Sequence, residues 1–129
     1  MYTYQYITAL RAHCKRIGVT APDAFWKARA KDLAAVYNGI GPEAWHPTFR
    51  SVVSWLLSPF SAAALPHDWA WSQEEKSYKG FTKSNLEFAY NAWREALCQK
   101  RVALIPMGLF FALLCQVFGW KGYRGNDKI

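Results

Sequence analysis

The spacing of apolar residues predicts an amphipathic helix at the start of the chain. Apolar side chains recur three or four positions apart, at Tyr6, Leu10, Cys14 and Ile17. That period places them on one face of a helix. Gly18 follows at once, and glycine is a common residue just after the last turn of a helix. The first helix is therefore expected to end at Ile17.

A second helix is predicted over residues 20–37. Thr20 is a suitable capping residue, and apolar residues continue at helical spacing after it. Asn38 and Gly39 are expected to end this helix. Residues 38–47 contain two glycines and two prolines, which is typical of an irregular loop.

The middle of the chain predicts two helices separated by a proline. Thr48 is a suitable capping residue and the residues after it, up to Leu57, are very apolar, so we expect a short helix there. Pro59 interrupts the apolar run, because proline is poorly tolerated inside a helix. A new helix is predicted to begin at Ser61 or a neighbour and to end near Trp71, and it carries His67 and Asp68.

Residues 72–80 are mostly polar and predict a loop. Residues 72–81 are also the one place where a short hairpin is an alternative. Thr82 or Ser84 is expected to cap the following helix. That helix ends near Lys100, whose charge suits the negative end of a helix dipole.

Residues 102–120 carry no charged side chain. Their length qualifies them as a candidate for a transmembrane helix. Pro106, Gly108 and Gln116 weaken that interpretation, and we favour a very apolar helix that is buried or associated with a membrane surface.

Composition and helical periodicity together predict the fold class and the number of domains. The chain has 129 residues, of which 52% are hydrophobic and 19% are charged, enough to bury one core. Because helical periodicity runs through almost every segment, we predict an all-α fold in which residues 1–129 form a single domain.

The net charge and the cysteines restrict the possible partners and the expected cellular compartment. The net charge of +7 suits nucleic acid, an anionic lipid surface or an acidic protein partner. The basic residues are scattered and form no known motif, so no nucleic-acid partner is indicated. Three cysteines without a CxxC pair argue against a disulfide framework. The N-terminus has no signal-peptide pattern, and a cytoplasmic location is expected.

Two motifs point to chemistry. Tyr37-Asn38-Gly39-Ile40-Gly41 is a glycine-rich turn that can aim several backbone carbonyls at one cation. Calcium prefers such oxygen ligands, and Asp68 offers the carboxylate that would anchor its charge. The neighbouring His67 would then be free to act as a general base.

Together these motifs resemble the phospholipase A2 family, in which a Tyr-x-Gly-x-Gly loop precedes a helix that carries His-Asp. The alanine run at residues 62–64, shortly before His67 and Asp68, is similar to the compact, disulfide-free forms found in parvovirus capsids. Small phage-encoded proteins are similar as well. The resemblance covers residues 37–93, with helices arranged around a calcium-type loop.

The resemblance implies calcium-dependent hydrolysis of a phospholipid ester at a membrane surface. His67 would deprotonate the attacking water, and calcium with the Gly39 backbone amide would stabilise the oxyanion. Asn85 stands where the family has an aspartate that orients the histidine. The implied calcium ligands are Tyr37, Gly39, Gly41 and Asp68.

Three departures from the family pattern weigh on catalysis. Asn85 can accept a hydrogen bond from His67 but cannot stabilise the imidazolium charge as a carboxylate does. Trp71 stands in place of a tyrosine, and residues 48–57 lengthen the separation between the two motifs. Slow catalysis, or no catalysis, is therefore expected.

A second hypothesis keeps the scaffold without the chemistry. In it, the chain is a catalytically silent phage protein in the host cytoplasm, and its basic, aromatic surface binds and inhibits a host protein. Activity after His67→Ala separates the two hypotheses.

Overall fold

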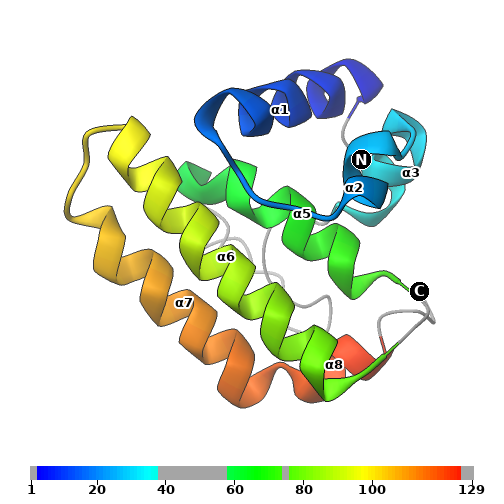
Figure 1. The fold of residues 1–129 in the computed structure, drawn as a ribbon, viewed down its shortest axis with the longest axis vertical. Coiled ribbons are helices and arrows are strands. Elements are labelled where there is room, and N and C mark those ends of the chain that lie inside the picture. The colour runs from blue at the N-terminus through cyan, green and yellow to red at the C-terminus, as the bar shows by residue number, and fades with distance from the viewer. Residues whose placement is uncertain (1–2, 38–57, 74–75, 126–129) are drawn as a thin grey trace.

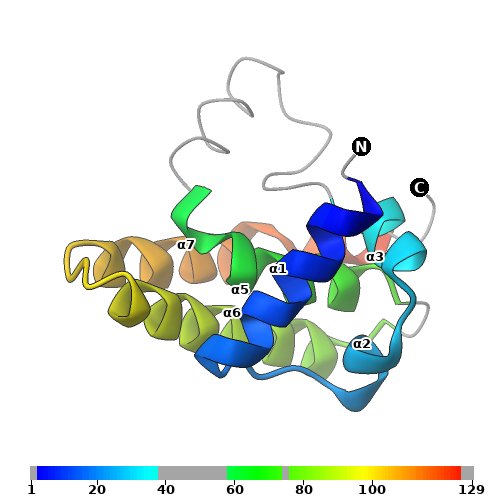
Figure 2. The ribbon, with the colours of Figure 1, turned by 90° about the horizontal axis from the view of Figure 1, so that it is seen from above.

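Two long antiparallel helices form the frame on which the other elements pack. The turn at residues 99–103 joins α6 (Tyr78–Cys98) to α7 (Leu104–Phe118), and the two helices lie side by side (Figure 1). On its other side α6 contacts α5 (Ser61–Trp71), while α1 (Tyr4–Ile17) packs against α5 (Figure 2). The computed structural model describes residues 3–37, 58–73 and 76–125, and within these ranges there is no strand. The predicted small all-α domain is therefore confirmed.

The first helix has the predicted end and the predicted buried face. Thr3 caps α1 by accepting a hydrogen bond from the Tyr6 backbone N–H at 3.1 Å. Gly18 ends the helix with φ 82°, a left-handed conformation that favours glycine. The Arg94 guanidinium lies against Gly18, where a side chain would collide with it. The buried positions of α1 are Ile7, Leu10, Cys14 and Ile17.

The continuous helix predicted over residues 20–37 is wrong. Two short helices, α2 (Asp23–Lys27) and α3 (Ala30–Val36), replace it, and Pro22 rather than Thr20 precedes the first. Arg11 of α1 donates to the carbonyls of Phe25 and Ala28. These bonds satisfy acceptors that a longer helix would have used internally, so the chain can become extended between the two helices.

Helix α5 begins at Ser61 as predicted, after a 3-10 turn at Ser58–Phe60. Its first turn is capped from a distance by Glu95 of α6. The carboxylate accepts hydrogen bonds from the Ala62 and Ala63 backbone N–H groups, each at 3.0 Å. Burial raises the pKa of Glu95 to about 7, against the lowering effect of these two bonds. Because the Glu95 side chain is buried, α5 and α6 are joined here by a water-excluded polar contact.

Helix α6 begins earlier than predicted. Ser77, not Thr82 or Ser84, is its N-cap, and the Ser77 hydroxyl accepts a hydrogen bond from the Gly80 N–H at 3.0 Å. The polar residues at 78–80 therefore belong to the first turn of a helix. No hairpin is present in the described residues between 72 and 81.

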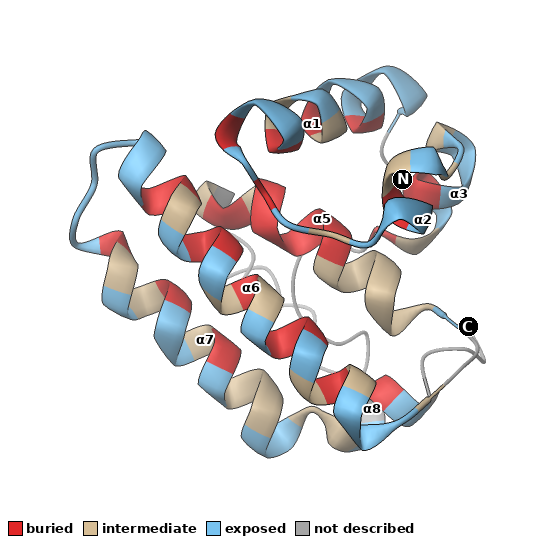
Figure 3. Ribbon diagram, in the orientation of Figure 1, coloured by how far each residue is buried: buried red, intermediate tan, exposed pale blue. Residues whose placement is uncertain are grey.

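Helix α7 packs through small residues and exposes large ones. A side chain on Gly108 would lie 2.7 Å from the Ala92 Cβ, so α6 and α7 approach closely at this point. Figure 3 shows buried positions on the side of α7 that faces α6 and exposed positions on its outer side. The predicted helix over residues 102–120 is therefore buried on one face only. The exposed large apolar residues of α7 are Leu109, Phe110, Leu113, Val117 and Phe118.

Helix α7 ends at Phe118, and α8 (Trp120–Gly125) follows after a break at Gly119. In the parts of the chain that the structure describes, every helix is too short or too polar to cross a lipid bilayer.

Candidate active site

His67 lies in the second half of α5 and faces α6. Its imidazole is half-buried between two aromatic rings. The ring centroids of Trp71 and Phe88 lie 4.8 Å and 5.3 Å from that of His67. The imidazole therefore packs against two aromatic side chains.

Asn85 of α6 is buried and contacts the imidazole directly. The His67 Nε2 and the Asn85 Oδ1 are 2.9 Å apart. On its other side, the Asn85 Nδ2 donates to the Gln116 Oε1 of α7 at 2.8 Å. With the amide nitrogen committed to Gln116, the amide oxygen faces His67, so the hydrogen of the imidazole lies on Nε2.

This arrangement leaves the other ring nitrogen, Nδ1, with a lone pair. Nδ1 makes no hydrogen bond within the described ranges of the chain. Burial lowers the pKa of His67 to about 4, although the bond to Asn85 works in the opposite direction. At neutral pH the imidazole is uncharged, which is the state a general base requires.

Asp68 follows His67 in α5 and is half-buried. Burial raises the pKa of the Cys115 thiol of α7 to about 12, and the nearby Asp68 charge adds to this rise. The Asp68 carboxylate therefore lies close enough to α7 to affect Cys115.

The predicted calcium loop lies mostly outside the described residues. Tyr37, its first residue, is buried at the end of α3, which packs against α5. Gly39 and Gly41 lie outside the described part of the chain. Within residues 3–37, 58–73 and 76–125, no three His, Cys, Asp or Glu side chains gather as a metal-binding group. The predicted ligands differ from such a group, because most of them are backbone carbonyls.

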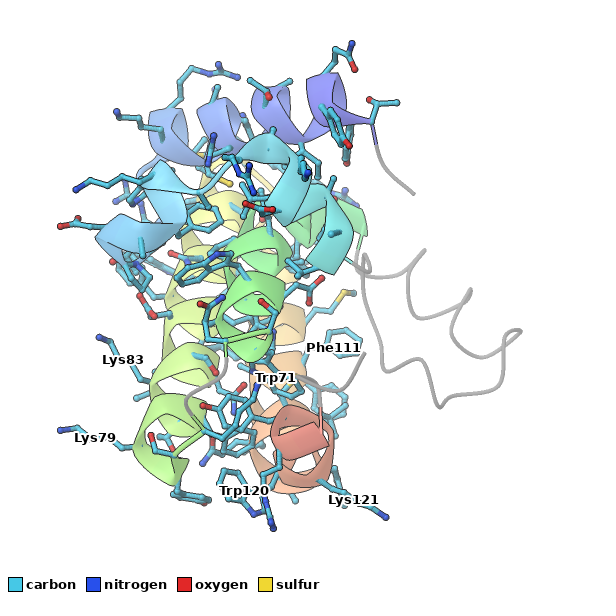
Figure 4. All side chains as sticks on the ribbon, turned by 90° about the vertical axis from the view of Figure 1, so that its right-hand side faces the viewer. Trp71, Lys79, Lys83, Phe111, Trp120 and Lys121 are labelled. Carbon is cyan, nitrogen blue, oxygen red and sulfur yellow. The ribbon has the colours of Figure 1, made fainter. Side chains whose placement is uncertain are left out.

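Trp71, the residue in the place of the family's tyrosine, closes one end of the site. Its indole Nε1 donates to the Ser84 hydroxyl at 3.0 Å. Figure 4 shows the partly buried Trp71 between α5 and α8, while Lys79 and Lys83 project outward from α6. The Trp71 ring also contacts Tyr123 of α8, at 5.7 Å between centroids.

Gln116 is the site residue that sequence reasoning missed. In the sequence Gln116 is a polar interruption in an apolar segment, and in the structure its amide nitrogen donates to Thr82 at 3.0 Å and to Tyr78 at 3.3 Å. A signal was present, because Gln116 is the single amide side chain in residues 102–120. The structure thus brings together His67, Asn85 and Gln116 from three helices.

Comparison with known proteins adds no relative to this picture. No family model, curated protein or solved structure matches the chain. The functional argument therefore rests on the residues and their geometry.

Proposed function

We propose that this protein is a phospholipase A2-like acyl ester hydrolase with His67 as its general base and calcium as its cofactor. The observation that carries the proposal is the 2.9 Å contact between His67 Nε2 and Asn85 Oδ1. This contact fixes the ring and leaves Nδ1 able to accept a proton.

In the proposed reaction, His67 Nδ1 takes a proton from a water molecule, and the water oxygen attacks the ester carbonyl carbon. The imidazolium then returns the proton to the departing alcohol oxygen. Asn85 holds the ring in place throughout. Because an amide does not offset the imidazolium charge as a carboxylate does, the chemical step is expected to be slow.

Calcium would be held by the Asp68 carboxylate and by backbone carbonyls of Tyr37, Gly39 and Gly41. An oxygen-only ligand set of this kind fits a hard cation. Two placements support the set: Asp68 adjoins the base in α5, and α3 brings Tyr37 to the core against α5. Calcium bound there would supply positive charge to the oxyanion of the ester carbonyl. The Gly39 backbone N–H would donate to the same oxygen.

The outer face of α7 supports a phospholipid surface as the place of action. Leu109, Phe110 and Leu113 are all more than half exposed on a helix with small residues on its packed face. Lys100 and Arg101 precede α7, and Lys121 follows it. No acidic residue occurs from residue 96 to residue 126. An apolar face with positive charge at both ends suits a helix lying on an anionic lipid surface.

The similarity to compact phage-encoded forms extends the proposal to a bacteriophage protein that acts in the cytoplasm of its host. The test of the chemistry is fatty-acid release from anionic phospholipid vesicles with calcium present. We expect release by the native chain, loss of release with a calcium chelator, and loss with His67→Ala.

His13→Ala provides the matched control. His13 is a partly exposed residue of α1 whose contact is with Arg16, so its removal should leave fatty-acid release unchanged. Release that persists in His67→Ala at the native rate would overturn the proposed role of His67.

A silent interaction protein is the second candidate. The neutral Asn85 beside His67 favours it, and the exposed apolar face of α7 would then bind a host protein. This alternative predicts no calcium binding and unchanged inhibition of the host protein in His67→Ala.

A further inference from the structure

Gln116 lies one hydrogen bond beyond the Asn85 side chain that contacts His67. It reaches from α7 across to α6 and makes three hydrogen bonds there. Its Oε1 accepts from Asn85 at 2.8 Å, and its Nε2 donates to the Thr82 and Tyr78 hydroxyls at 3.0 Å and 3.3 Å. Gln116 is half-buried, so these bonds are partly shielded from water.

The hydrogen bonds that link His67 to Tyr78 share one donor-to-acceptor direction. In the structure the amide nitrogens of Asn85 and Gln116 both donate away from the imidazole, Asn85 to Gln116 and Gln116 to the hydroxyls. The Asn85 oxygen that faces His67 can only accept, so His67 must donate to it. The reverse direction would turn both amides and present the Asn85 NH₂ to His67. The imidazole would then carry its hydrogen on Nδ1, and the lone pair would be on the wrong nitrogen.

We propose that Gln116 is a positioning residue that sets the orientation of the Asn85 amide and thereby selects the tautomer of His67. The inference rests on the proposed function for its importance to catalysis. The effect on the tautomer is a property of the protein alone. It requires neither calcium nor substrate.

Two substitutions with side chains of similar length should orient the Asn85 amide in opposite ways. Gln116→Glu offers only acceptors, so Asn85 Nδ2 must still face residue 116 and His67 keeps its hydrogen on Nε2. Gln116→Lys offers only donors, so the Asn85 oxygen turns toward residue 116 and the amide nitrogen faces His67. The hydrogen of the imidazole then moves to Nδ1.

The readout is the nitrogen NMR chemical shifts of the His67 ring at pH 8 in calcium-free protein. We expect the Nε2–H tautomer in the native chain and in Gln116→Glu, and the Nδ1–H tautomer in Gln116→Lys. Helical circular dichroism establishes that each variant is folded. A folded Gln116→Lys that keeps the native Nε2–H shifts would overturn the proposal.

If Gln116→Lys does not fold, Gln116→Met takes its place, since methionine is a good helix former of similar size. Without an acceptor for Asn85, the Nδ1–H population should rise above its native level, and an unchanged population contradicts the proposal. A tautomer change in a chain that releases no fatty acid supports the role of Gln116 while refuting the hydrolase. In an active protein, Gln116→Lys should lower kcat by about 10²-fold.

Discussion

The two ends of the contact between α5 and α6 both bury polar side chains, but they differ in what is left unsatisfied. At the start of α5, both carboxylate oxygens of Glu95 bind backbone N–H groups at 3.0 Å. Near its end, His67 binds Asn85 through one nitrogen and keeps the other available. The first end caps a helix, whereas the second orients an imidazole through one of its two nitrogens.

Burial favours the neutral form of the titratable side chain at both ends. It raises the pKa of Glu95 to about 7 and lowers that of His67 to about 4, so each neutral form is favoured. For Glu95 this is a cost in stability at high pH. For His67 it supplies an uncharged base at neutral pH. The same physical effect therefore costs stability at the Glu95 end and keeps the imidazole neutral at the His67 end.

The largest effect is expected from Glu95→Ala. The substitution leaves the buried Ala62 and Ala63 N–H groups without an acceptor, at about 1–3 kcal/mol each. The free energy of unfolding, measured in urea, should fall by about 2–6 kcal/mol. Glu87→Ala on the partly exposed side of α6 is the control and should change it little. Equal urea midpoints for the two variants would contradict the capping role.

The pH dependence of stability provides a second test of the Glu95 end. Its folded pKa of about 7 lies above the ordinary glutamate pKa of 4.5, so the folded state binds more protons between these values. The Glu95 contribution to stability is therefore greatest below pH 4.5 and falls as the pH rises toward 7, whereas His67, whose pKa is lowered to about 4, contributes a rise between pH 4 and 6.5. At about 1.4 kcal/mol per unit, the Glu95 contribution to this fall is about 3 kcal/mol. Glu95→Gln lacks the titrating group, so urea titrations should show its stability gaining on that of the native chain by about this amount between pH 4.5 and 7.

Asn85→Asp sharpens the contrast at the His67 end. A carboxylate beside Nε2 stabilises the imidazolium formed during the reaction, and Gln116 can turn its NH₂ toward the new carboxylate. Vesicle hydrolysis should rise by about 10²-fold in kcat, the inverse of a typical loss on removing such a group. Burying the new charge should lower the melting temperature.

Asn91→Asp is the matched control for this gain. Asn91 is also buried on α6, where its amide bonds to the backbone N–H and carbonyl of Thr20. Its substitution should lower stability without raising kcat. If the hydrolysis rate rises equally in both variants, or in neither, Asn85 takes no part in the reaction.

The smallest predicted effect concerns the outer face of α7. Phe110→Ser combined with Leu113→Ser removes two exposed apolar side chains, and the affinity for anionic vesicles should fall about tenfold. Cosedimentation with vesicles measures this. Tyr4→Ser, at an exposed position on α1, should leave affinity unchanged. Equal binding by the double variant and the native chain would exclude this face as the lipid contact.

Sequence periodicity predicted those elements whose ends are set locally. The end of α1 follows from Gly18, and the start of α5 follows from the proline before it. The break between α2 and α3 was missed because it depends on Arg11, which reaches there from another helix. Ser77 was missed as a cap because the first turn of α6 is polar and solvent-exposed.

The site was predicted unevenly for the same reason. His67 and Asn85 could be named from a motif, and the structure brings them into contact. Gln116 could not be paired with Asn85, because 31 residues and a turn separate them. Glu95 has a charged side chain that normally faces solvent, so only the packing of α5 on α6 reveals its buried role.

Calcium titration followed by NMR tests the central claim most directly, namely that the loop at residues 37–41 and the His67–Asp68 pair form one site. The account predicts that the backbone amides of Gly39 and Gly41 and the signals of Asp68 shift together with a single Kd. It also predicts that Asp68→Asn abolishes these shifts, while His67→Ala retains them. Shifts that do not saturate, or that persist in Asp68→Asn, would contradict the calcium-dependent hydrolase and leave the silent interaction protein as the better account.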